Sequence, residues 1–263
     1  MNNVVKQIKL LIKFIFFRKV FLPYLWFFLA RSQSNNLENK NIKKYAQSLD
    51  IDRSFIEFGF HPFAYNCVGL TKLNYKGFVI DGDSQTCNKA NYIFKKLGFN
   101  TKAKKHWITL SSIDIILKFV KNNGNKLGLL SVDIDGNDYW ILKEIYRTVK
   151  PEIIVTEHNA SFREKSISVK YEENFDRKKF HKSGWYHGAS ISAFYNLLKN
   201  DYFLIENING LNLIFIRKDK LNGKFSPLLP NQAFKEPFLR NKWSGTDTLN
   251  QWEEIKNLKY NQV

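Results

Sequence analysis

The feature that most constrains the fold is a regular alternation of short apolar segments and helical segments between residues 54 and 160. Segment 127–132 is apolar and ends at Asp133, whereas segment 111–122 carries its apolar residues at helical spacing. Alternation of this kind predicts a parallel sheet with helices on both faces. The predicted strands are 55–58, 76–80, 100–103, 127–132 and 153–156, and the predicted helices are 66–73, 86–97, 111–122 and 139–149.

A different pattern follows toward the C-terminus. Segments 202–205 and 211–216 are apolar and flank Asn209-Gly210, which is a strong hairpin signal, so we expect the last strands to be antiparallel. Residues 220–263 contain three prolines and no clear alternation. The chain therefore divides into an N-terminal segment, an α/β domain and a C-terminal extension, with expected ranges 1–34, 35–219 and 220–263.

The N-terminal segment 1–34 is both apolar and basic. It carries six of the 41 Lys and Arg residues and no acid, in a chain whose net charge is +17. Lys6, Lys9 and Lys13 fall on one helical face. The longest uncharged run, 20–30, contains Pro23 and is shorter than the roughly 20 apolar residues of a membrane span. We expect an anchor on an anionic membrane surface; a docked helix pair, a span and a signal peptide are the alternatives.

The composition also excludes several classes. Two cysteines, Cys67 and Cys87, rule out a disulfide framework and a cysteine-rich zinc site, and they suit a reducing compartment such as the cytoplasm. The excess of positive charge fits an anionic partner, but AT-rich coding sequence would also produce it. No nucleic-acid recognition motif is present, so nucleic acid is not the expected partner. The sequence does not indicate an oligomeric state.

Acidic residues stand where four predicted strands end: Glu57, Asp81, Asp133 and Glu157. The carboxyl ends of parallel strands lie at one edge of a sheet, and ligands bind there, where the strand order reverses. Carboxylates gathered at one edge repel each other, which favours a ligand with hydroxyls, a positively charged group or a metal ion. Taken singly, such a residue can instead cap a helix, as Asp83 or Asp138 would.

Two strand ends suggest a nucleoside ligand. Asp81, with Asp83 as the alternative, is placed to accept hydrogen bonds from the two ribose hydroxyls of an adenosine. Gly59, which follows the first strand, allows the backbone to approach a ligand closely.

Segments 55–59, 77–82, 130–140 and 151–159 resemble the class I S-adenosylmethionine-dependent methyltransferases, and most of all their FkbM-like branch. The resemblance covers residues 54–160 and extends more weakly to about residue 218. It implies a Rossmann-like, doubly wound, mostly parallel sheet with a C-terminal antiparallel hairpin. It also implies S-adenosylmethionine as cofactor and O-methylation of a saccharide or glycolipid hydroxyl in surface polysaccharide synthesis, at the inner face of the membrane. The cofactor-binding residues would be Glu57, Gly59, Asp81, Gly82, Asp83 and Asp133.

Methyl transfer requires a positioned acceptor and a base that removes its proton. His158 is the first candidate base, and His187 and His181 are weaker candidates. Asp133 and Asp135 are expected to hold acceptor hydroxyls or a Mg²⁺ ion, because hard oxygen ligands suit this ion.

Two alternatives remain open. Asp133-Ile134-Asp135 also resembles the DxD motif of metal-dependent glycosyltransferases. The loop after Gly59 departs from the glycine-rich loop usual in methyltransferases, since Phe60 and His61 follow the single glycine. That departure leaves a non-catalytic, membrane-associated methyltransferase-like protein as the other alternative.

Overall fold

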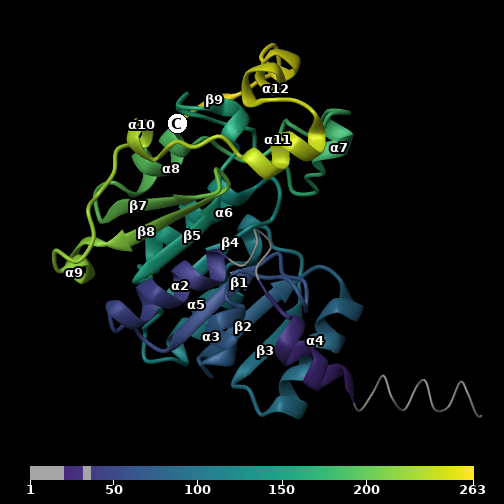
Figure 1. Ribbon diagram of the computed structural model, residues 1–263, viewed down its shortest axis with the longest axis vertical. Helices are drawn as coiled ribbons and strands as arrows, with labels where there is room; N and C mark the ends of the chain where they lie inside the picture. The colour runs from purple at the N-terminus through teal and green to yellow at the C-terminus, as the bar shows by residue number, and fades with distance from the viewer. Residues whose placement is uncertain (1–20, 32–36) are drawn as a thin grey trace, which may run out of the picture.

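The computed structural model describes residues 21–31 and 37–263 (Figure 1). The predicted helical face with Lys6, Lys9 and Lys13 lies outside these residues. Within the described ranges, no helix combines the length and the apolar character that crossing a membrane requires.

A seven-stranded sheet forms the centre of the molecule, in the order β3-β2-β1-β4-β5-β8-β7. The first five strands in this order are parallel, whereas β8 runs antiparallel to both β5 and β7. The predicted mostly parallel sheet with a C-terminal hairpin is thus confirmed. The strands are β1 Ser54–Phe58, β2 Lys76–Asp81, β3 Thr101–Lys105, β4 Leu129–Val132, β5 Ile153–Glu157, β7 Tyr202–Ile208 and β8 Asn212–Arg217.

Helices cover both faces because successive strand residues point to opposite sides. Phe55 faces one core, built with α2 (Leu37–Ser48), α3 (Val68–Lys72) and α4 (Ser84–Leu97). Ile56 faces the other core, built with α5 (Asp114–Lys121), α6 (Asp138–Thr148) and α8 (Ile191–Leu198). Strands β1, β2, β4 and β5 therefore each contribute to two apolar layers, whereas β3 at the edge contributes Ala103 to the first layer only.

The C-terminal residues are ordered and pack on the same body. After α9 (Lys218–Leu221) come α10 (Pro230–Ala233), α11 (Phe238–Ser244), α12 (Thr248–Ile255) and β9 (Asn261–Gln262). Strand β9 pairs with β6 (Ile167–Ser168), and Ile255 of α12 joins a third apolar cluster with Phe162. In Figure 1 the yellow helices α11 and α12 lie at the top of the molecule, with α11 near α7 (Arg177–Phe180).

The strand order reverses between β1 and β4, and there the two loops that follow these strands touch. Gly59 has φ +72°, and a Cβ atom at this position would lie 1.6 Å from the carbonyl oxygen of Asp133. Only glycine fits such a position, because any side chain would meet backbone.

We predict that Gly59→Ala lowers the free energy of unfolding by about 3 kcal/mol or more, since strain and a backbone clash add together. Gly98→Ala is the matched control: Gly98 has φ +71°, but nothing lies within 4 Å of its Cβ position. The control should lose only about 1–2 kcal/mol, the cost of the left-handed conformation. Urea denaturation of both variants measures the difference, and equal losses would show that the contact with Asp133 is unimportant.

Candidate functional site

A cavity of about 590 Å³ opens beyond the carboxyl ends of β1, β2, β4 and β5. This volume is typical of a small-molecule site, and its place at the reversal of strand order is where open α/β sheets bind ligands. Its walls come from the loops after these strands and from α7 and α11. The lining residues at the strand ends are Gly59, Phe60, His61, Asp81, Gly82, Asp133, Asp135 and Glu157.

Glu57 does not line this cavity. Its Oε1 accepts a hydrogen bond from the backbone N–H of Asn66 at 2.7 Å, and its Oε2 accepts one from Cys67 at 2.8 Å. Burial raises the pKa of Glu57 to about 7 despite these bonds. Both oxygens are therefore used to hold the loop after β1, and the expected direct contact of Glu57 with a cofactor is not supported.

Asp81 and Asp83, the two candidates for a ribose ligand, lie in different environments. Asp81 lines the cavity, and its Oδ1 accepts a hydrogen bond from the N–H of Asp83 at 2.7 Å. Burial raises the pKa of Asp81. Asp83 is exposed and caps α4, where it accepts hydrogen bonds from the N–H groups of Gln85 and Thr86. The geometry therefore favours Asp81 over the alternative Asp83, because the oxygens of Asp83 are bonded to the helix N-terminus and Asp83 does not line the cavity.

Asp138 organises the loop after β4. Its Oδ1 accepts from Ile134 N and its Oδ2 accepts from Gly136 N, both at 2.8 Å. Burial raises the pKa of Asp138 to about 6. Within the loop, Asp135 takes φ +58° and pairs with Arg177 of α7 at 2.7 Å. The loop conformation thus exposes Asp135 to the cavity and brings a positive charge beside it.

Two carboxyl groups of the cavity resist ionisation. Burial and the charge of Glu157 raise the pKa of Asp133 well above its usual range. Burial, with the charges of Asp135 and Asp138 added, raises the pKa of Glu157 to about 8, although Arg240 and Arg177 oppose this shift. Glu157 therefore keeps its proton at neutral pH more readily than an ordinary glutamate.

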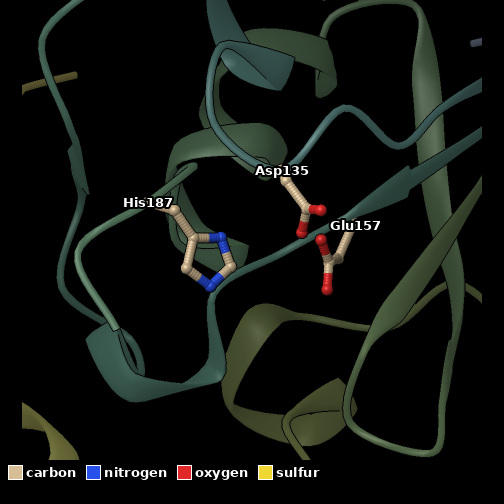
Figure 2. Close-up of side chains that lie close together, drawn as sticks. All are labelled: Asp135, Glu157 and His187. Atoms are coloured by element: carbon tan, nitrogen blue, oxygen red, sulfur yellow. The ribbon is translucent and has the colours of Figure 1, made fainter. Parts of the chain in front are cut away.

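Asp135, Glu157 and His187 form a cluster that spacing along the chain did not predict. One potential ligand atom from each lies within 4.8 Å of the others. Figure 2 shows the imidazole of His187 beside the two carboxylates. Burial, together with the charges of Arg177 and Arg240, lowers the pKa of His187, so its ring is neutral at neutral pH. Two oxygen donors and a neutral imidazole suit a divalent cation, and the set shares only Asp135 with the expected pair of Asp133 and Asp135.

His158 is placed away from the cavity. It is 1% exposed, and its Nε2 lies 3.2 Å from Nδ2 of Asn207 on β7. Burial, with the positive charge of Arg240 added, lowers the pKa of His158 to about 3. Successive residues at a strand end point to opposite sides, so Glu157 faces the cavity and His158 does not. The structure therefore gives no support to His158 as the base that contacts an acceptor. His181 does not line the cavity either.

The wall opposite the strand ends comes from α11, which sequence reasoning left unassigned. Leu239, Arg240 and Trp243 of this helix line the cavity. Nη2 of Arg240 donates to Gln251 Oε1 at 2.9 Å, while its Nε and Nη1 are buried and have no hydrogen-bond partner within 21–31 and 37–263. Trp107, after β3, is another lining residue that was not predicted. The residues of α11 gave no recognisable signal because they lie in a short helix far from the strand ends in sequence, whereas Trp107 lies two residues after β3 and could have been considered.

Comparison with known proteins finds similarity to solved structures at low sequence identity. No family model matches the chain, and neither does any curated protein. Among solved structures, it is similar to an O-methyltransferase from Bacillus cereus in complex with SAH (11% identity, 72% of this chain and 84% of that chain covered, TM-score 0.45). It is also similar to an S-adenosylmethionine-dependent methyltransferase from Clostridium acetobutylicum (9%, 68% and 90%, 0.44). A third is a putative caffeoyl-CoA O-methyltransferase from Staphylococcus aureus (11%, 69% and 83%, 0.47). Likenesses at these levels carry no inference about the chemistry of this chain.

Proposed function

We propose that the protein is an S-adenosylmethionine-dependent methyltransferase that methylates a hydroxyl of a saccharide or glycolipid. The observation that carries the proposal is the position of Asp81 at the end of β2, with its side chain lining a cavity at the reversal of strand order. A carboxylate at this place can accept hydrogen bonds from both hydroxyls of a ribose. This assignment also agrees with the resemblance of segments 55–59, 77–82 and 130–140 to class I methyltransferases, including the FkbM-like branch.

The carboxyl groups of the cavity suit a positively charged ligand, because such a ligand would lower the raised pKa of Asp133 and Glu157 and favour their ionised forms. Four carboxyl groups line the cavity, from Asp81, Asp133, Asp135 and Glu157, against the two guanidinium groups of Arg177 and Arg240. A sulfonium group placed near the ends of β1 and β4 would be stabilised by this field. The bulky loop after Gly59 leaves room for a ligand, because Phe60 is 3% exposed and packs against Tyr65.

When bound, S-adenosylmethionine supplies an electrophilic methyl group on its sulfonium. The chain must then hold an acceptor oxygen near the strand ends and take up its proton. Glu157 in its ionised form is our candidate for this proton, because a pKa of about 8 leaves a fraction ionised near neutral pH and makes that carboxylate a stronger base than an ordinary glutamate. Trp107 and Trp243 are exposed aromatic residues at the cavity and offer faces on which a sugar ring can stack.

The cluster of Asp135, Glu157 and His187 could hold a divalent cation. Asp135, Glu157 and His187 supply suitable donor atoms, and an ion there would acidify an acceptor hydroxyl. Arg177 already neutralises Asp135 through its ion pair, which weakens the site for a metal. The Mg²⁺ requirement stays a prediction.

A glycosyltransferase is the second candidate, since Asp133 and Asp135 lie at the cavity as a DxD motif would require. The diphosphate of a nucleotide sugar is anionic, however, and the excess of carboxylates would repel it unless a metal ion intervened. Calorimetric titration with S-adenosylhomocysteine, and in parallel with UDP-glucose plus Mn²⁺, separates the two functions. We expect micromolar binding of the first ligand only; binding of the second alone would overturn the methyltransferase proposal.

We predict that Asp81→Asn weakens S-adenosylhomocysteine binding about tenfold or more, because a hydrogen bond to a charged group contributes about 1.5–3 kcal/mol. Asp83→Asn is the matched control. Asparagine also caps helices well, and Asp83 does not line the cavity. The affinity of this control for S-adenosylhomocysteine should therefore stay within about twofold of the wild type. Calorimetry measures both. Unchanged affinity in Asp81→Asn, or equal losses in the two variants, would remove the ribose assignment.

The raised pKa of Glu157 gives a second prediction. The folded chain holds this proton up to about pH 8, whereas an unfolded glutamate releases it near its ordinary value of 4.5. The resulting stability is complete below pH 4.5 and is lost as pH rises through 8. Glu157→Gln keeps an uncharged side chain at every pH, so its thermal midpoint should rise relative to the wild type between pH 5 and pH 9. At pH 9 the free energy of unfolding of Glu157→Gln should exceed that of the wild type by about 1.4 kcal/mol or more, which is the equivalent of one pKa unit.

Glu144→Gln is the control for this titration, since Glu144 lies on the surface of α6 and pairs with Arg147. Its effect on stability should stay within about 0.5 kcal/mol across the same pH range. If Glu157→Gln gains nothing as the pH rises, Glu157 is ionised in the folded chain and does not titrate as a base near neutral pH.

A further inference from the structure

The helix over residues 21–29 is apolar on the side that faces away from the protein. Pro23 and Trp26 are buried, whereas Tyr24 is 62% exposed and Phe28 81% exposed. Six of the large apolar side chains that are exposed in the described part of the chain belong to this one helix. They are Phe21, Tyr24, Leu25, Phe27, Phe28 and Leu29. A contiguous apolar patch of this kind marks an interaction surface.

The helix is fixed to the domain by its buried side, so the apolar patch is presented outward. Nε1 of Trp26 donates to the carbonyl oxygen of Pro62, and the Trp26 ring packs against Phe94 and Phe99 at 5.8 and 5.5 Å between centroids. Nζ of Lys72 donates to the carbonyl oxygen of Ala30 at 2.7 Å. In Figure 1 this purple helix lies beside α4, which contains Phe94.

Two basic side chains, Lys72 and Arg31, lie beside this helix. Nζ of Lys72 lies 5.6 Å from the centre of the Phe27 ring. Burial, together with the nearby positive charge of Lys43, lowers the pKa of Lys72. Arg31 follows the helix and is exposed. In the sequence, residues 1–31 contain six basic residues and no acid. An apolar surface with basic side chains beside it is complementary to an anionic lipid surface.

We propose that this helix docks the protein onto an anionic phospholipid bilayer, with Tyr24, Leu25 and Phe28 inserted at the level of the headgroups. Aromatic side chains suit this depth, because their rings are apolar while the Tyr hydroxyl stays in water. Residues 1–20, which precede the docking helix in the sequence, are also apolar and basic. The proposal does not depend on the enzymatic activity.

Docking would also set the position of the cavity. Arg31 N donates to the carbonyl oxygen of Phe63 at 3.1 Å, and the N–H of Tyr65 donates to the carbonyl oxygen of Arg31. The docking helix is thereby bonded to the loop after Gly59, and Phe60 and His61 of that loop line the cavity. The bilayer surface would lie next to the wall of the cavity, within reach of a lipid-linked acceptor.

Sedimentation of the full chain with vesicles tests the proposal. The probes are vesicles of phosphatidylcholine alone and of phosphatidylcholine mixed with phosphatidylglycerol. The test variant is Leu25→Ser with Phe28→Ser, both on the exposed side of the helix. The matched control is Leu249→Ser with Phe238→Ser, which removes the same two residue types at exposed positions in α12 and α11.

We expect the wild type and the control to bind the anionic vesicles at least tenfold more strongly than the neutral ones. The test variant should lose at least tenfold in partitioning to anionic vesicles while its thermal midpoint is unchanged. Equal binding by test variant and wild type, or equal binding of the wild type to both kinds of vesicle, would overturn the proposal. So would a dimer in the absence of vesicles that only the test variant dissociates, because the patch would then be covered by a second copy of the chain.

Discussion

The close contact between Gly59 and the carbonyl of Asp133 is the constraint on which the site depends. It occurs where the sheet order reverses, so the loops after β1 and β4 must leave the sheet in opposite directions while touching at their first residues. A side chain at residue 59 would push these loops apart. The cavity exists at this place because the backbone of one loop lies directly on the backbone of the other.

The acidic residues at the strand ends serve two different purposes. Glu57 and Asp138 are buried, and each uses both carboxylate oxygens to bind backbone N–H groups of a neighbouring loop. Asp81 and Glu157 instead present oxygen atoms to the cavity. The first pair holds the loops in place, and the second pair remains available to a ligand in the cavity. Stabilising the loops and binding a ligand are thus tasks for separate carboxylates.

Periodicity predicted the sheet, its antiparallel hairpin and the edge at which the cavity opens, because strands that bury both sides have a distinct sequence pattern. The assignment of single residues was less successful. Asp83 precedes a helix by one residue, and this capping position could have excluded it as a ligand. Strand alternation would have favoured Glu157 over His158. Glu157 ends β5, Asp133 follows the neighbouring strand β4, and His158, as the next residue, points to the opposite side. His187 was only a weaker candidate base and Arg240 gave no signal. Tertiary packing alone brings His187 beside Asp135 and Glu157 and brings Arg240 to the cavity.

The contribution of α11 to the cavity has a consequence for synthesis of the chain. Every strand of the main sheet precedes residue 218, whereas Leu239, Arg240 and Trp243 follow it. During translation the sheet residues therefore emerge from the ribosome before the last wall of the cavity does. A nascent chain at that stage has its strand-end carboxylates but neither Arg240 to offset their charge nor Trp243 to cover them. The cavity therefore gains its full set of lining residues only after α11 has been synthesised.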